Sequence, residues 1–462
     1  MRETSIDALE PRRAQLTALQ RETRRPSLAG NLHYLRCYSA HDAPSTGGDR
    51  PLVLLLATEG GALVGFLALR RRPPKYGSAA TIGSLVTHHG GCDLIARPAD
   101  EARCADAFRR YLLDVEPGWS KIEIARQHAD SPLFFVPDVD DPILVRRTPS
   151  APHIVLPLPY ASFNEYWTTR AATFRSSVGR NVRKLFAAGR VELVRCDDVR
   201  GAQALLDLHV ELEARSWKAR ATPPLDLGRA PARLAFYRAL LAPDIDPTLS
   251  PHFAFVLLDG ALVAGMFAID FAGTSFWQEI AHDDAFERLG PGAFVVLLGI
   301  WDALERGAAT IDFGFGVEQY KARWGGEVSP TWNLELVRLD SLAFLRAIVG
   351  LIRRRRRSRA DVAAAPVAAN EAKVEVRAEA LLTSPLAALA PLDGEARLRR
   401  IEAGHVRLRR LSGVALEAVL PLSVASHVAT TNTNSSKNDS DAERRRRDGH
   451  GSRAAAPEGQ PH

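Results

Sequence analysis

The hydrophobic and polar positions follow the same order in the first and second halves of the chain. An apolar run, a turn that contains glycine and a second apolar run occupy residues 51–69 and again residues 252–270. The Asp259-Gly260 pair in the second of these patterns is typical of a tight turn that joins antiparallel strands. Each pattern therefore predicts a β-hairpin, and the tetrapeptide Gly-Ala-Leu-Val occurs in both.

Three further segments follow each hairpin in the same order: a strand, an amphipathic helix and a short strand. We expect them at 79–87, 100–115 and 119–125 in the first half, and at 273–281, 292–306 and 309–314 in the second. Glu123 and Asp312 hold equivalent places in the last strand of each series. An ordered series that repeats at a fixed offset indicates two copies of one structural unit. The prediction is an α/β fold with mixed sheets, made of units at residues 1–150 and 151–345.

The last part of the chain, residues 346–462, differs from the rest in composition. Phe344 is the last aromatic residue, and from Arg353 onward 20 Lys and Arg residues stand against 13 Asp and Glu residues. Residues 1–352 hold 40 against 41, so the net charge of +6 comes from the tail. A long segment without aromatic residues cannot easily bury a core. We expect a mostly disordered basic tail, with short helices near 371–382 and 393–411.

Residues 341–352 form an apolar segment that precedes an arginine cluster at 353–359. It predicts either a last helix packed on the core, which is the favoured interpretation, or a helix that contacts an anionic membrane surface or nucleic acid. No apolar run is long enough for a transmembrane helix, and the N-terminus has no apolar signal segment. The four cysteines are far apart, and His88-His89-Gly-Gly-Cys92 has no second ligand cluster. We therefore expect a cytoplasmic protein without a metal site, in contact at most with the inner membrane surface.

A glycine-rich turn precedes the helix predicted at 292–306. Gly290 and Gly292 allow backbone amides to approach an anion closely, and helix N-termini attract phosphate. The alternative is an ordinary loop. The equivalent turn of the first copy, Arg97–Cys104, has no glycine, and its acidic residues would repel phosphate. Only the second copy is expected to hold a phosphorylated cofactor.

Several motifs together resemble the FemAB-like branch of the GNAT acyltransferase superfamily, in which two GNAT units follow one another and the first is degenerate. The likeness is greatest to the CelD-type (BcsL) acetyltransferases of cellulose and exopolysaccharide biosynthesis, and it extends from about residue 30 to residue 340. The segments that carry it are Phe163–Trp167, Arg180–Lys184, Ser216–Lys218, Leu289–Gly292, Ile311–Gly314 and Glu318–Gly325.

This resemblance implies that acyl-CoA, acetyl-CoA in particular, is the donor. Its pyrophosphate loop would correspond here to Glu287-Arg288-Leu289-Gly290-Pro291-Gly292, with glutamate where the superfamily prefers Gln or Arg. The implied cofactor-binding residues are Arg288, Gly290, Gly292 and Ala293. FemAB relatives use aminoacyl-tRNA instead, so the identity of the donor stays open.

Acyl transfer requires a base for the nucleophile and donors for the tetrahedral oxyanion. By the resemblance, Glu279 is the first candidate for the base, because GNAT enzymes often place a base on the strand that leads to the phosphate loop. Strand alternation puts Glu279 on the same face as Trp277. The alternative is a solvent-facing carboxylate. The other candidates for the base are His282, Asp283 and Asp284. Their alternative role is to cap a helix or a loop.

Three further candidates lie downstream of this strand. Asp312 would orient the substrate or the Lys321 ammonium, unless it is only a turn residue before Gly314. Lys321 would stabilise developing negative charge, with a surface lysine as the alternative. Tyr320 would protonate the leaving group. By the resemblance, the loop at Trp217-Lys218 borders the acceptor cleft, which Trp277 would also line.

The sequence predicts an acyltransferase that moves acetyl from acetyl-CoA to an amine or a sugar hydroxyl by direct attack in a ternary complex. Two alternatives remain: an aminoacyl-tRNA-dependent transferase whose basic tail binds tRNA, and a non-catalytic scaffold in polysaccharide synthesis. A basic helix that Ser162 and Glu165 would begin as a capping box is either a further surface for an anionic glycan, CoA or tRNA or a solvated basic face, which is the favoured interpretation for most of its cations. Its cations are Arg170, Arg175, Arg180, Arg183 and Lys184.

Overall fold

A computed structural model describes most of the first 341 residues and part of the tail. The described residues are 1–42, 52–72, 79–86, 93–116, 118–134, 143–196, 198, 201–316, 319–341, 344, 392–403, 406–412 and 415. The loop at 88–92, the predicted tail helix at 371–382 and the arginine cluster at 353–359 lie outside them, as does almost all of the segment at 341–352. Within the described ranges, every helix is too short or too polar to cross a membrane.

One mixed sheet of fourteen strands runs through the described residues. Its strands are β1 (Arg2–Glu3), β2 (Leu52–Glu59), β3 (Ala62–Arg72), β4 (Ala80–Ser84), β5 (Ile95–Ala96), β6 (Trp119–His128), β7 (Ile143–Pro157), β8 (Val191–Cys196), β9 (Ser250–Leu258), β10 (Ala261–Phe271), β11 (Thr274–His282), β12 (Thr310–Phe315), β13 (Glu327–Arg338) and β14 (Arg409–Ser412). Their spatial order is β1-β2-β3-β4-β6-β13-β7-β12-β11-β10-β9-β8-β14, and β5 pairs with β3.

The two predicted copies have the same strand pairing. In the first copy β2, β3 and β4 form an antiparallel meander, and β6 joins β4 in parallel. In the second copy β9, β10 and β11 do the same, and β12 joins β11 in parallel. The helix that crosses between the third and fourth strands is α3 (Glu101–Arg110) in the first copy and α9 (Pro291–Glu305) in the second. The predicted α/β fold and the predicted order of its elements are therefore confirmed.

The two halves also exchange a strand, which the sequence pattern did not predict. β13 follows the second copy in the chain, yet it pairs with β6 of the first copy on one side and with β7 on the other. β7 in turn pairs with β12 of the second copy. Both halves therefore share one continuous sheet, and the boundary predicted at residue 150 falls inside β7.

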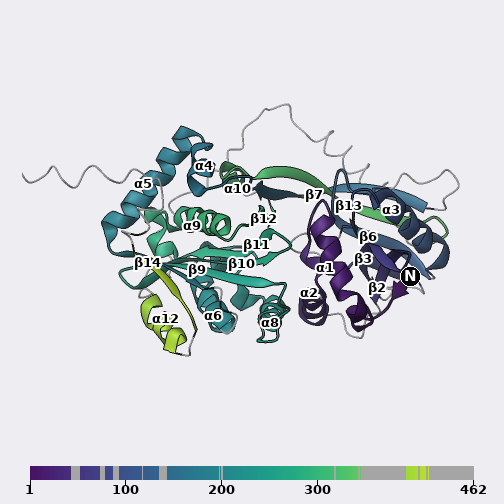
Figure 1. Cartoon of the computed structure of the whole chain (residues 1–462), viewed down its shortest axis with the longest axis horizontal. Helices are drawn as coiled ribbons and strands as arrows, with labels where there is room; N and C mark the ends of the chain where they lie inside the picture. The colour runs from purple at the N-terminus through teal and green to yellow at the C-terminus, as the bar shows by residue number, and fades with distance from the viewer. Residues whose placement is uncertain are drawn as a thin grey trace, which may run out of the picture. The chain divides into compact units, whose positions relative to one another are not determined.

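Helices cover both faces of the second half of the sheet (Figure 1). On one side lie α4 (Phe163–Thr168), α5 (Ala172–Ala188) and α9, and on the other lie α6 (Ala202–Glu213), α8 (Pro231–Leu240) and α12 (Gly394–Ala403). In the first half α1 (Arg13–Glu22) packs on β3, and α2 (Leu32–Cys37) contacts α8. Two short helices, α7 (Trp217–Arg220) and α10 (Gln319–Arg323), border the site described below.

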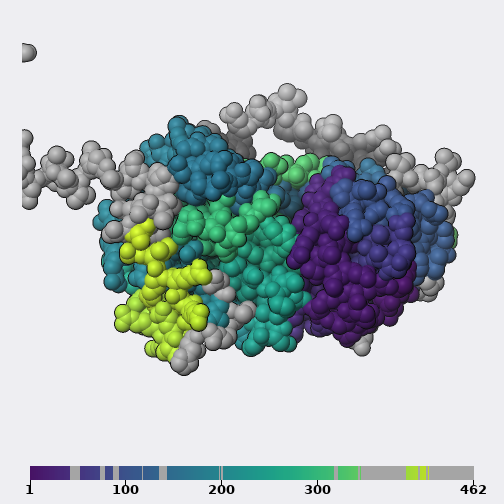
Figure 2. All heavy atoms as spheres, in the orientation of Figure 1, coloured from purple at the N-terminus to yellow at the C-terminus, as the bar shows by residue number. Residues whose placement is uncertain are grey.

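Part of the basic tail belongs to this folded body. α12 begins within the helix predicted at 393–411, but residues 409–412 form a strand that pairs antiparallel with β8. Leu398 of α12 is fully buried, and in Figure 2 the atoms of this segment lie against those of the second half. The strand was missed because its sequence, Arg-Arg-Leu-Ser, has a single apolar residue.

The helix predicted to begin at Ser162 differs from the observed one. The Ser162 hydroxyl accepts a hydrogen bond from the Glu165 amide at 3.2 Å, so the predicted cap is confirmed. The helix ends at Thr168, however, and α5 begins separately at Ala172. Arg170 therefore lies in the connection, where it donates to the Trp324 carbonyl at 3.0 Å, and the other predicted cations lie on α5.

Candidate active site

The strands β11 and β12 separate along their length. They are paired in parallel at three positions, the last of which joins Phe276 to Asp312. Beyond these residues the two strands continue without pairing to each other, as far as His282 and Phe315. The edge of β11 that faces β12 is therefore open over its second half. Two pockets lie along this part of the strand and share Trp217 and Ile280 in their linings.

The larger pocket, of about 790 Å³, lies between α5, the end of β11 and the start of α9. The predicted residues Gly292 and Ala293 line it. No side chain caps the N-terminus of α9, and the first amides of a helix have no intrahelical acceptor. The helix therefore presents donors and a positive dipole end to this pocket.

Glycine is required at the entrance to α9. Gly290 has a φ of 71°, in the left-handed region that L side chains rarely adopt, and a Cβ there would lie 2.7 Å from Cγ of Asn181. At Gly292 a Cβ would lie 2.9 Å from Nδ1 of His282. The turn and its neighbours thus fit together only if both positions lack side chains. An ordinary loop, the alternative interpretation of this turn, would not need such close contacts between its backbone and neighbouring side chains.

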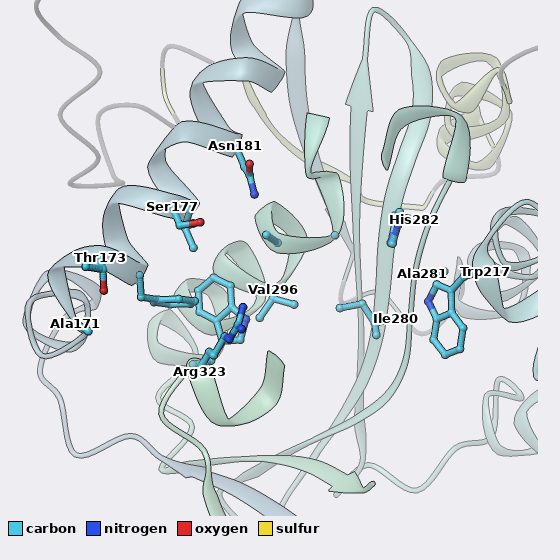
Figure 3. Close-up of a pocket in the computed structure, with 15 residues that line it drawn as sticks. Ala171, Thr173, Ser177, Asn181, Trp217, Ile280, Ala281, His282, Val296 and Arg323 are labelled. Carbon is cyan, nitrogen blue, oxygen red and sulfur yellow. The ribbon is translucent and has the colours of Figure 1, made fainter. Parts of the chain in front are cut away.

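Polar side chains surround the same helix terminus. Ser177 and Asn181 extend from α5 and His282 from β11, while Trp217 lies at the other end of the pocket (Figure 3). Arg323 adds a cation to the lining. The predicted Arg288 is exposed on the turn before α9 and does not line the pocket.

Glu287, the residue that departs from the superfamily loop, is also exposed and lies outside the pocket lining. Its backbone carbonyl accepts the Gly290 amide at 2.9 Å. Of the residues considered as rival bases, Asp283 caps the following turn, as predicted, by accepting the Ala285 amide at 2.9 Å. Asp284 pairs with Arg220.

The second pocket, of about 430 Å³, brings together several residues that are distant in the sequence. Lys218, Trp277, Glu279 and Lys321 line it, in addition to the shared Trp217. All five had been predicted as site residues. Trp217 is 44% exposed, whereas the other four are at most 8% exposed. The pocket is therefore a polar recess with an aromatic rim.

Glu279 belongs to a buried network of charges. One carboxylate oxygen accepts a hydrogen bond from Lys218 Nζ at 2.6 Å, and the other lies 3.6 Å from Nε of Arg233. The Tyr237 hydroxyl donates to Glu279 at 3.4 Å. Lys218 also donates to Glu213, which is fully buried. Two carboxylates thus alternate with two cations, and the alternative of a solvent-facing Glu279 is wrong.

The protonation of this network follows from its contacts. Burial alone would lower the pKa of Lys218, but the charges of Glu279 and Glu213 raise it above its ordinary value. Burial alone would raise the pKa of Glu213, but a hydrogen bond from His209 and the charge of Lys218 lower it. Burial and the neighbouring Glu279 raise the pKa of Tyr237 well above its ordinary value. The structure therefore favours a charged pair flanked by a neutral phenol.

Lys321 and Asp312 both form hydrogen bonds with the backbone at Phe313 and Gly314. Lys321 Nζ donates to the Phe313 carbonyl at 2.9 Å, and one Asp312 oxygen accepts the Gly314 amide at 2.6 Å. The same oxygen of Asp312 lies 2.8 Å from Nε2 of His153. Asp312 lines neither pocket. The side chain of Tyr320 lies outside the described part of the structure.

Sequence reasoning missed the partners of these residues. His153 on β7 connects Asp312 to His128, with 3.1 Å between the two imidazole nitrogens. Burial lowers the pKa of His128 to about 4. Nothing in the local sequence marks His153, Arg233 or Arg126, which also lines the second pocket. In the described ranges, no three His, Cys, Asp or Glu side chains are arranged to hold a metal ion.

Comparison with solved structures supports the fold. FemX aligns with a TM-score of 0.51 and 12% sequence identity, over 72% of this chain and 98% of its own. A protein of unknown function from Bacteroides thetaiotaomicron VPI-5482 aligns with a TM-score of 0.46 and 11% identity, over 73% and 99%. A tandem GNAT protein from the clavulanic acid biosynthesis pathway aligns with a TM-score of 0.37 and 12% identity, over 74% and 98%. The chain thus has a FemX-like fold.

Comparison of the sequence with known protein families gives a match in the second half of the chain. No curated protein matches the chain. Residues 172–322 match the family described as "Acetyltransferase (GNAT) domain". This range contains α5, the open strand β11, the glycine turn before α9, and Lys321. Residues 172–322 are therefore similar in sequence to the acetyltransferase domains of the GNAT superfamily.

Proposed function

We propose that this protein transfers an acyl group, acetyl in the first instance, from acyl-CoA to an amine or sugar hydroxyl by direct attack in a ternary complex. The observation that carries the proposal is the pair of pockets that meet at Trp217 and Ile280. One contains an uncapped helix N-terminus, and the other contains Glu279 and Lys321. A donor and an acceptor can thus be held side by side.

The larger pocket suits the donor. The amides of Gly292 and Ala293 would hold the pyrophosphate, with Asn181, Ser177 and Arg323 as further polar neighbours. The open edge of β11 offers backbone groups to the amides of an extended ligand, as a sheet edge does in strand addition. When bound, acyl-CoA supplies the activated thioester. Arg288 would contribute only from outside the pocket.

The smaller pocket suits the acceptor and the proton transfers. Glu279 would take the proton of the attacking amine or hydroxyl, and Lys218 would hold that carboxylate in place. Lys321 would stabilise the charge that develops on the carbonyl oxygen. Asp312 would act indirectly, by fixing the backbone at Gly314 next to the carbonyl that holds Lys321. Tyr320 remains our candidate for protonating the leaving thiolate.

Calorimetric titration with acetyl-CoA and desulfo-CoA tests the donor site. We expect micromolar binding of both, and loss of binding in Gly292→Glu, because the new side chain meets His282 and places a carboxylate at the helix terminus. Ala187→Glu, on the exposed end of α5, is the matched control for added charge and should bind normally. Absence of binding to the intact protein at millimolar acetyl-CoA would exclude the donor that we propose.

Turnover separates an enzyme from a scaffold. With an accepted amine or hydroxyl substrate, Lys321→Met should reduce kcat about 10²- to 10³-fold, the usual cost of removing one oxyanion donor. Glu279→Gln should reduce kcat as well, because the amide cannot take the proton of the attacking group. Thermal unfolding of both variants shows whether the loss is catalytic. Unchanged turnover in either variant would remove that residue from the mechanism.

The resemblance to CelD-type acetyltransferases leads us to propose an acceptor from exopolysaccharide or cell-envelope biosynthesis, in the cytoplasm or at the inner membrane surface. We propose the same division into a degenerate unit, a catalytic unit and a basic tail.

If acetyl-CoA does not bind, the 20 cations from Arg353 onward favour a charged-tRNA donor. Replacing the six arginines at 353–357 and 359 by serine would then weaken tRNA binding steeply, and a chain inactive with either donor would be a scaffold.

A further inference from the structure

Arg126 brings a cation from the first half of the chain into the acceptor pocket of the second. It lies near the end of β6 and lines the pocket together with Lys321 and Glu279. Its guanidinium carbon lies 4.6 Å from the ring centroid of Phe315, at the end of β12. The planar group thus stacks on an aromatic face, an arrangement that leaves its N–H donors directed sideways.

The backbone at Arg126 is shaped by a β-bulge. On β13, Leu334 pairs with Ile124 and Trp332 pairs with Gln127, so two residues of β6 oppose Asn333 alone. Arg126 has a φ of 57°, a left-handed conformation that costs a residue other than glycine about 1–2 kcal/mol. The Asn333 side chain holds it by accepting the Arg126 amide at 3.1 Å.

Bulges and strained residues of this kind redirect side chains and are concentrated at functional sites. A regular strand would have paired residue 126 within the ladder and turned its side chain by the usual alternation. The extra residue instead delivers the guanidinium to the pocket wall. The strained backbone at Arg126 therefore places a cation in the pocket, which a regular strand in the same sheet would not do.

The charge of Arg126 lacks compensation within the described residues. Lys218 pairs with Glu213 and Glu279, and Arg233 lies against Glu279, whereas no described carboxylate forms an ion pair with Arg126. Burial lowers the pKa of its guanidinium. A partly buried cation without a counter-charge is stabilised when an anion binds to it.

Two buried polar atoms in the same lining also have no hydrogen-bond partner among the residues that the structure describes. They are the indole Nε1 of Trp277 and the amide oxygen of Gln278, on residues that are 7% and 6% exposed. Gln278 is itself the extra residue of a bulge, because Glu279 pairs with Phe267 while Trp277 pairs with Ala268. Buried donors and acceptors normally have partners, so the pocket is prepared for a polar ligand.

We infer that Arg126 binds an anionic oxygen group of the acceptor, a carboxylate or a phosphate, and that Trp277 and Gln278 make further hydrogen bonds to the same molecule. This inference rests on the proposed function, since it names the acceptor of that site. The substrate class is a small amine or hydroxyl compound that carries a negative charge. The first half of the chain then selects the substrate on which the second half acts.

Ligand pairs that differ in charge test the inference directly. Tryptophan fluorescence titration without any donor compares glucosamine 6-phosphate with glucosamine, and alanine with alaninamide. The intact protein should bind the anionic member of at least one pair about ten- to hundredfold more tightly, as expected for a charge-assisted hydrogen bond. The first pair reports a phosphate and the second a carboxylate. Equal binding of both members in both pairs would overturn the inference.

Variants assign the preference to one residue. Arg126→Met keeps the side-chain stem and should abolish the preference, while Arg190→Met removes an exposed cation beyond the end of α5 and should leave it intact. Arg126→Lys retains the charge without the planar fork, should keep part of the preference, and serves if the methionine variant does not fold. A preference that survives in both Arg126 variants contradicts the assignment.

A competition experiment distinguishes this inference from the proposed function. Saturating desulfo-CoA should leave binding of the anionic ligand unchanged, because the two molecules occupy adjoining pockets. Displacement by desulfo-CoA would mean that Arg126 binds a donor phosphate, which would overturn the inference. If the anion preference depends on Arg126 but acetyl-CoA fails to bind the intact protein, the pocket stands as assigned and the proposed donor is wrong.

Discussion

Replacing Lys218 by methionine removes the cation that lies between two buried carboxylates. Methionine fills a similar volume, so the main change is electrostatic. Glu213 is fully buried and Glu279 is 8% exposed, so water can hydrate neither carboxylate well. Removing one partner from a buried ion pair costs about 3–5 kcal/mol, because the remaining charge is no longer compensated. We expect a loss of this size in the free energy of unfolding at pH 8.

The loss should depend on pH in a defined direction. Without Lys218, a carboxyl of the pair gains a folded-state pKa above its unfolded value of about 4.3. Such a group stabilises the fold fully below the unfolded pKa, and this contribution disappears as the pH rises through the folded pKa. The difference between the intact protein and the variant should therefore be smaller at pH 5 than at pH 8.

Urea denaturation followed by circular dichroism at both pH values provides the measurement. A cycle with Glu279→Gln and the double variant isolates the pairwise coupling, which should exceed 1 kcal/mol, roughly the upper limit for an exposed pair. Lys184→Met, on the exposed face of α5, is the matched control and should change stability by less than about 0.5 kcal/mol. Equal losses in the two lysine variants, or a loss independent of pH, would refute the reasoning.

Three further changes probe other parts of the fold. Gly290→Ala should destabilise the protein more than Gly307→Ala in urea denaturation, because both glycines have a left-handed φ but only at Gly290 does the new Cβ meet a neighbour; equal losses would contradict this. Leu398→Ala should cost about 2–5 kcal/mol, against little for the exposed Leu339→Ala, if α12 packs in solution as it does in the structure. Burial lowers the pKa of His128 to about 4 from an ordinary value of 6.5, so the unfolded chain binds the proton first, and the fold should lose up to about 3 kcal/mol as the pH falls from 6.5 to 4. The variant His128→Gln should lose less stability over this range, and parallel curves for the two proteins would rule the explanation out.

The sequence predicted those parts of the fold that depend on local patterns. Apolar runs with glycine turns specify the hairpins at 51–69 and 252–270, because alternation and turn chemistry act over a few residues. The glycine turn before α9 followed from Gly290 and Gly292 for the same reason, and the helix predicted at 292–306 begins one residue earlier, at Pro291. The prediction that Glu279 and Lys321 are site residues relied on a resemblance, and the structure places them in one pocket.

The remaining features depend on pairings between distant segments. The bulge at Arg126 is defined by Asn333, about two hundred residues later, and no pattern around either residue indicates it. Asp312 was expected to orient the substrate or the Lys321 ammonium, and no pattern in the sequence indicated that its side chain contacts His153 on β7. The strand β14 has too few apolar positions to be recognised without β8 beside it.

The strand exchange between the halves has a consequence for protein synthesis. β6 ends at His128, but its neighbour β13 begins only at Glu327. At about 5–20 residues per second, a ribosome needs about 10–40 s to make the intervening chain. During this time one edge of β6 has no strand to pair with, and open edges favour association with other chains. The nascent first half must therefore wait for a strand made after the second, and it is during this interval that we expect it to need a chaperone.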